Sequence, residues 1–105
     1  MKILKKVIDH ANSTLKEIED YVKEAFVLRA EHKNLADSFV KIAEQHVNIF
    51  NTLHEKMIML VEEEKSKNSN IPEVMKEMWK EEHNEVIEEF AKVKFMIEEY
   101  KKLGY

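Results

Sequence analysis

The stretch that decides the fold is residues 4–28, which read LKKVIDHANSTLKEIEDYVKEAFVL. Apolar residues recur in it at spacings of three and four, the period of one face of an α-helix. Charged and polar residues fill the positions between them. The pattern predicts a first helix over about residues 3–31. Its core-facing positions are Leu4, Ile8, Ala11, Leu15, Ile18, Val22, Ala25 and Leu28.

The same period predicts a second helix over about residues 35–65. Its apolar stripe is Leu35, Phe39, Ile42, His46, Ile49, Leu53, Met57 and Leu60. The four residues before it, 31–34, contain no Gly or Pro. Asn34 suits an N-cap with Asp37 three residues later, so we expect a tight turn here. The alternative is one continuous helix of about 60 residues that pairs as a coiled coil.

A third helix is predicted over about residues 71–102. Pro72 suits a first helical turn, and Asn70 with Glu73 resembles a capping box. Gly104 follows the last periodic residue as a stop signal. The stripe of this helix is Met75, Trp79, His83, Val86, Phe90, Val93, Ile97 and Tyr100.

Composition agrees with an all-α class. The 105 residues include one Gly and one Pro, too few breakers for the many turns of a sandwich or barrel. Charged residues make up 36% and hydrophobic residues 44% of the chain, as in amphipathic helices. The length fits a single domain over residues 1–105. We therefore predict an antiparallel bundle of three long helices.

Composition also argues against several functions. The chain has no Cys, which excludes disulfides, a thiol nucleophile and Cys-ligated metals, and suits the cytoplasm. The net charge is −4 and the lysines alternate with glutamates, so we expect no nucleic-acid partner. Acidic residues within the first 20 positions argue against a signal peptide or a membrane span.

Two histidines, His46 and His83, occupy apolar stripes. A buried imidazole must hydrogen-bond or ligate something. One interpretation is a core histidine bonded to a neighbouring Glu, Tyr or backbone carbonyl; the other is a ligand. In antiparallel hairpins, His10 lies level with His54, and His54 level with His83. We therefore predict that His10, His54 and His83 share one layer, which either binds zinc or another divalent metal or is a stacked polar layer.

Three helical rods make a thin core. Phe26 and Phe95 fall outside their stripes, which suggests a second apolar seam. We expect this seam to be buried by dimerisation, which would complete a four-helix or larger bundle. A monomeric three-helix bundle is the alternative.

Three segments carry a resemblance to a known family: Tyr21-Val22-Lys23-Glu24-Ala25, Leu35-Ala36-Asp37-Ser38-Phe39 with Leu53-His54, and Pro72 through Trp79 and His83 to Lys94. The chain resembles, over about residues 14–102, small ferritin-like proteins of the rubrerythrin type, of the kind found in Firmicutes and their phages. The resemblance implies a ferritin-like bundle.

In the di-iron members of that family, the first helix supplies a Glu and the second a Glu-x-x-His. The resemblance places Thr14 at the first of these positions, and His46 and Ile49 at the second pair. It therefore implies a degenerate metal site.

We expect a non-catalytic bundle that acts as a structural or protein-interaction module, without a cofactor and with an unknown protein partner. The alternative is a metal-binding protein of the same fold. It would hold zinc or iron at a remodelled histidine/carboxylate site made by His10, His54 and His83, with Asp9 or Glu55 nearby. A third possibility is a coiled-coil adaptor with one long N-terminal helix.

Overall fold

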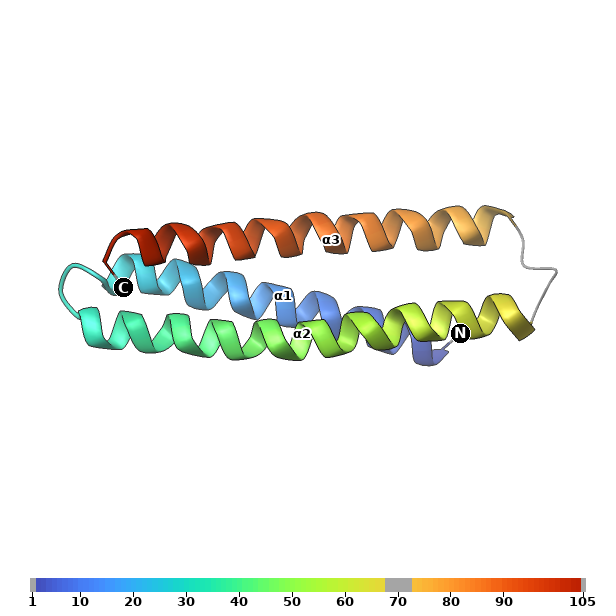
Figure 1. Cartoon of the computed structure of the whole chain (residues 1–105), viewed down its shortest axis with the longest axis horizontal. Helices are drawn as coiled ribbons and strands as arrows, with labels where there is room; N and C mark the ends of the chain where they lie inside the picture. The colour runs from blue at the N-terminus through green and yellow to red at the C-terminus, as the bar shows by residue number, and fades with distance from the viewer. Residues whose placement is uncertain (1, 68–72, 105) are drawn as a thin grey trace.

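The computed structural model describes residues 2–67 and 73–104, which form three helices: α1 (Lys2–Leu28), α2 (Lys33–Lys67) and α3 (Glu73–Lys102). The helices run antiparallel along a common axis and form a rod about 57 Å long (Figure 1). The described ranges contain no strand, which confirms the all-α class. None of these helices is both long enough and apolar enough to cross a membrane.

The break between the first two helices is confirmed, and the alternative of one continuous helix is wrong. The chain turns between Leu28 and Lys33, where the amide of His32 donates to the Leu28 carbonyl at 2.7 Å. The His32 carbonyl accepts the first bond of α2, from the amide of Ala36. The N-cap is therefore His32. The prediction of Asn34 as N-cap was wrong by two residues, because Asn34 already lies in the first helical turn.

The end of α3 matches the stop signal in the sequence. The helix ends at Lys102, and Gly104 adopts a φ of 105°, a left-handed conformation that Gly accepts without a Cβ clash. The predicted capping residues Asn70 and Pro72 lie outside the described residues.

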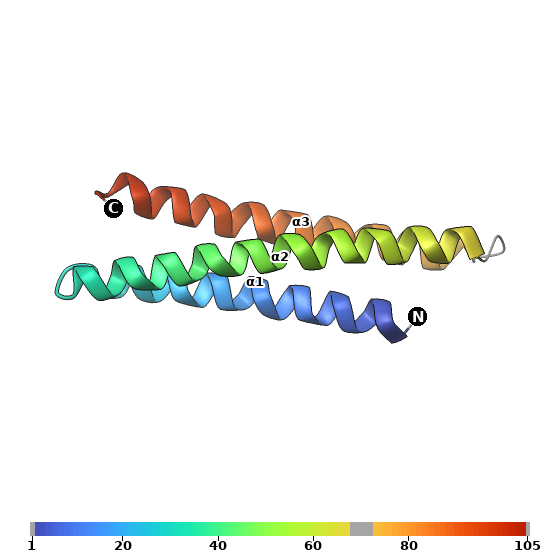
Figure 2. The same ribbon diagram turned by 60° about the horizontal axis from the view of Figure 1, so that its bottom comes forward.

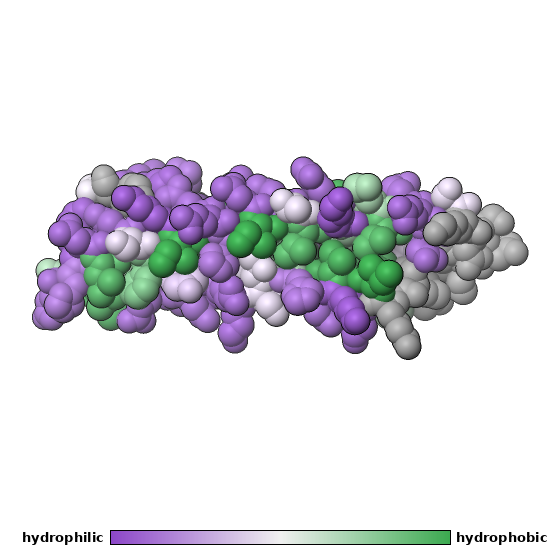
Figure 3. All heavy atoms as spheres, turned by 90° about the horizontal axis from the view of Figure 1, so that it is seen from below, coloured by the Kyte–Doolittle hydropathy of each residue, from purple (hydrophilic) through white to green (hydrophobic). Residues whose placement is uncertain are grey.

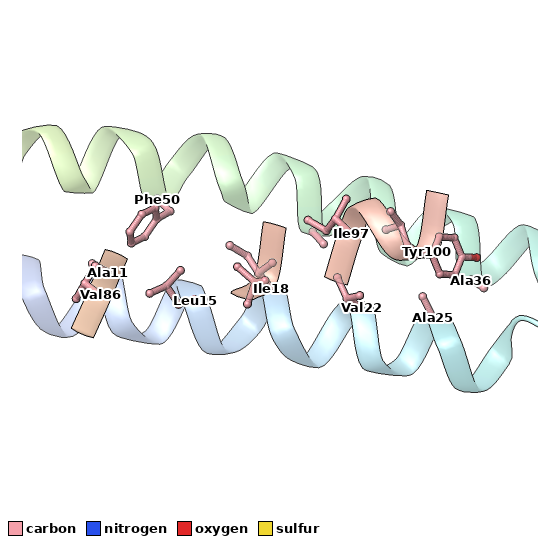
Figure 4. Close-up of a cluster of buried hydrophobic side chains, with 13 residues drawn as sticks. Ala11, Leu15, Ile18, Val22, Ala25, Ala36, Phe50, Val86, Ile97 and Tyr100 are labelled. Atoms are coloured by element: carbon pink, nitrogen blue, oxygen red, sulfur yellow. The ribbon is translucent and has the colours of Figure 1, made fainter. Parts of the chain in front are cut away.

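The predicted stripe of α1 is confirmed, since each of its eight residues is buried or half-buried. Side chains from all three helices interdigitate along the rod (Figure 4). Four alanines of this core, two on α1 and two on α2, are completely buried. Such small side chains let two helix backbones approach closely, so α1 and α2 pack along most of their length. The four are Ala11, Ala25, Ala36 and Ala43.

The predicted stripe of α2 is displaced by one residue from the true core line. Leu35 and Ile49 are 48% and 49% exposed, whereas their neighbours Ala36 and Phe50 are fully buried. One residue turns a helical side chain by about 100°. Met57, also in the predicted stripe, is buried as expected. The other predicted residues are half-buried at the edge of the core: Phe39, Ile42, His46, Leu53 and Leu60. Thus α2 carries two adjacent apolar stripes, and the bundle covers only one of them fully.

Helix α3 packs mainly on α1 and reaches α2 through large side chains. Its stripe is confirmed where its side chains are described, from Trp79 to Tyr100. The rings of Phe50 and Phe90 lie 4.3 Å apart between centroids, bridging α2 and α3. Turned so that the bottom of Figure 1 comes forward, the rod shows α2 in front of α1 and α3 (Figure 2).

At the end of the rod near the first turn, Tyr100 joins the three helices. Its buried ring contacts Phe26 edge-on, and its hydroxyl donates to the Asp37 carboxylate at 2.7 Å. The guanidinium of Arg29 lies over the same ring and also donates to the Leu103 carbonyl. The hydrogen bond from Tyr100, followed by the one from Lys33, lowers the pKa of Asp37.

The Tyr100 hydroxyl gives a first prediction. Tyr100→Phe keeps the ring but removes the hydrogen bond that favours the charged carboxylate, so the pKa of Asp37 should rise toward its ordinary value of about 3.8. An NMR titration of the side-chain carboxyl measures this. A carboxyl whose pKa is lower in the folded state stabilises the fold at pH values above that pKa, and this stabilisation is lost as the pH falls. The variant has less of it to lose, so its stability should fall less on acidification. An unchanged Asp37 pKa would contradict the contact.

The displaced stripe of α2 gives a second prediction. Phe50→Ala should lower the free energy of unfolding by about 3–5 kcal/mol, because it leaves a cavity in a fully buried site. Phe95→Ala is the matched control, since Phe95 is 63% exposed and should cost less than about 1 kcal/mol. Urea unfolding measures both. Equal losses would mean that Phe50 is not in the core.

Candidate functional site

The first histidine cluster joins α1 and α2. The Nε2 atom of His46 lies 3.0 Å from a Glu17 carboxylate oxygen, and its Nδ1 atom lies 2.9 Å from the Ile42 carbonyl. The ring also contacts Tyr21, with centroids 5.5 Å apart. This confirms that His46 is a histidine bonded to a Glu and a backbone carbonyl. Both partners are acceptors, so both contacts are hydrogen bonds when both ring nitrogens carry a proton.

The second histidine cluster joins α2 and α3. The rings of His54 and His83 stack with centroids 5.1 Å apart and 22° between their planes. His54 also stacks on Phe50, one turn earlier on the same helix. The predicted pairing of His54 with His83 across the second hairpin is therefore confirmed.

One polar atom of this cluster lacks a partner. Among the described residues, Nε2 of His54 is the buried side-chain nitrogen or oxygen without a hydrogen bond. Burial, and then the neighbouring His83, lower the pKa of His54, while Glu55 opposes them by raising it. Both main causes penalise the positive charge of the imidazolium. The cluster therefore favours a neutral imidazole at His54.

The third predicted metal ligand lies apart from this pair. His10 is exposed on α1, and the contact found there is made by its backbone carbonyl, which accepts a hydrogen bond from Thr14 at 2.8 Å. Over residues 2–67 and 73–104, no three His, Asp or Glu side chains are grouped so that they could hold a metal ion. The structure thus brings two imidazoles together, half of the usual four-ligand set of zinc. Metal binding stays a prediction.

Two of the three positions that the family resemblance implies for a metal site, those of Thr14 and Ile49, hold neither a carboxylate nor an imidazole; the third holds His46. Thr14 is buried, and its hydroxyl is bonded within its own helix. Ile49 is half exposed on the outer side of α2. Neither side chain can act as a carboxylate or imidazole ligand.

A cleft of about 450 Å³ opens beside the histidine pair, between the C-terminal part of α2 and the N-terminal part of α3. We call it the α2–α3 cleft. Its apolar walls come from Met57, Ile58 and Val61 on α2, Trp79 on α3 and Ile8 on α1. Lysines and glutamates alternate along its rim. The sequence signal for it was the run of five apolar residues at 57–61, because no single helix face can bury all five.

No protein-family model matches the chain, and comparisons with curated proteins and with solved structures give no match.

The buried His54 gives a third prediction. Because its folded-state pKa is lowered, the unfolded chain binds more protons as the pH falls below about 6.5, and folding stability should fall with it. His54→Phe should reduce that loss between pH 7.5 and 5.5. Urea unfolding followed by the fluorescence of Trp79, the single Trp, measures it. His10→Phe is the control at an exposed histidine; equal pH dependence in wild type and His54→Phe would contradict the effect of burial.

Proposed function

We propose that this chain is a non-catalytic, ferritin-like bundle of the rubrerythrin type that acts in the cytoplasm as a protein-interaction module and forms a homodimer. The observation that carries the proposal is the second apolar stripe of α2. It leaves Leu35 and Ile49, which lie 14 residues apart on one side of α2, about half exposed. Seen from the side on which α2 lies, apolar side chains form a broken band along the rod (Figure 3).

The physical argument is the arrangement of the helices. In a four-helix bundle, a fourth helix covers the stripes that three helices leave open. Here the described chain supplies three helices, and apolar side chains are exposed on a helix that already has one stripe in the core. Contiguous exposed apolar surface of this kind marks protein–protein interaction sites. A second copy of the chain supplies the helices that are missing.

The residues at the positions implied by the resemblance support a non-catalytic role. Thr14 and Ile49 stand where di-iron members have a Glu and a His. A site with these residues has lost side chains that bind and bridge metal ions. What the chain retains are long helices with apolar surface on them.

A fourth prediction tests this role. Sedimentation equilibrium at tens of micromolar should give a dimer, and His54→Ala/His83→Ala should leave the dimer intact. Protein expressed with iron, zinc and manganese supplied should then carry less than about 0.1 metal ion per chain after desalting. A wild-type monomer would contradict the proposed module.

The metal-binding alternative rests on one specific observation, the unpartnered Nε2 of His54 beside the His83 ring. Two imidazoles with water or a carboxylate as further ligands suit zinc or iron. In that case about one metal ion per chain would survive desalting, and the same double substitution would remove it. His10→Ala would show whether the third predicted ligand takes part.

A further inference from the structure

One outer face of the rod combines the second stripe of α2 with a matching side of α1. On α2, Leu35, Ile42, Ile49 and Lys56 recur every seven residues and so lie along one side of the helix. The Glu17–His46 contact shows where α1 borders this side, because His46 is one turn from Ile49. We call this surface the α1–α2 seam.

At the centre of the seam, each of the two helices has a segment without charged residues. Residues 45–54, ten in a row, contain no Asp, Glu, Lys or Arg, although 36% of the chain is charged. Residues 10–15 of α1 are also free of them. Since the helices are antiparallel and Glu17 meets His46, these two segments lie level with each other. Depletion of charge is the compositional mark of the centre of a protein interface.

The two ends of the seam carry opposite charges. Glu24 is exposed on α1 toward the first turn, two helical turns from Glu17, which lies beside His46 at the border of the uncharged centre. Lys6 lies about three turns before Glu17 on that same side, level with exposed Lys56 of α2. The seam therefore runs from Glu24, through an uncharged centre, to Lys6 and Lys56, and exposed Glu63 follows one heptad beyond Lys56 on α2.

We propose that the α1–α2 seam is the interface between two copies of this chain, packed antiparallel about a twofold axis at Ile49. The proposal rests on the proposed function and specifies the partner and the face. Ile49 lies near the midpoint of α2, so an axis there overlaps the two rods along their whole length. The uncharged centre of the seam in one copy then packs against the uncharged centre in the other.

The charges decide the direction of packing. Along the rod, Lys56 lies about 10 Å from Ile49 on one side, and Glu24 about 15 Å on the other. A twofold axis therefore brings the Glu24 of each copy near Lys56 and Lys6 of the other, within reach of these long side chains. Parallel packing would put acid against acid and base against base. Charge complementarity thus favours a second copy in the antiparallel direction.

A fifth prediction uses the absence of Cys from the chain. In Ile49→Cys the two introduced thiols meet across the axis, where a disulfide can form. Mild oxidation at tens of micromolar should convert most of the protein to a disulfide-linked dimer. Phe95→Cys is the control, on α3 and more exposed than Ile49. The sequence pattern placed Phe95 in a seam with Phe26, whereas the proposed interface lies on α1 and α2, so Phe95→Cys should stay largely unlinked.

A charge exchange tests the same interface without touching Ile49. At low salt, Lys56→Glu and Glu24→Lys should each raise the dimer dissociation constant about fivefold, because each change is present twice in a symmetric dimer. The combined variant should recover most of the affinity. Lys16→Glu is the control, since its position in the helix points it away from the seam.

The outcomes separate the two proposals. A wild-type dimer, with no disulfide cross-link in Ile49→Cys and no charge rescue, would overturn the seam as the interface and leave self-assembly standing. Loss of the dimer in Ile58→Asp, but not in Ile49→Asp, would place the interface at the α2–α3 cleft instead. A wild-type monomer would overturn the proposed function itself.

Discussion

The close approach of α1 and α2 is the constraint on which the rest of the structure depends. The core that these two helices share contains four fully buried alanines, two on each helix. Larger side chains there would push the backbones apart. The hairpin that results is narrow, and α3 completes the core from one side only. Its contact with α2 uses the large rings of Phe50, Phe90 and the histidine pair, which span a wider gap.

This asymmetry explains why α2 has apolar surface to spare. Its alanines and Phe50 face inward between α1 and α3, so the line through Leu35 and Ile49 turns about 100° away from the core. The half-buried residues between them, Phe39 among them, pack against Tyr21 at the edge of α1. A hairpin with small residues at its centre therefore exposes bulky residues at its margin.

Much of the fold follows from the sequence, because α1 and α3 each carry one clear stripe at the helical period. The stripe of α2 could not be placed from its period alone, since two adjacent stripes fit it equally well. The sequence prediction chose the stripe with the bulkier residues, which includes Leu35 and Ile49. In the structure, the stripe with Ala36 and Ala43 is the one that faces the core. For the candidate site, hairpin register predicted that His54 would meet His83. It could not predict that His10 is exposed, because level positions on two helices can point in different directions.

The two histidine clusters differ in a way that bears on both proposals. His46 contacts Glu17 and the Ile42 carbonyl, and the contact with Glu17 marks the α1 edge of the seam in the single chain. A surface that is already ordered loses less conformational entropy when it binds. His54 lies instead against α3, with a nitrogen left unbonded. Self-association at the seam and metal binding at His54 and His83 would therefore use different faces of α2. Substitutions in the seam should leave metal binding unchanged, and substitutions of the two histidines should leave the dimer unchanged.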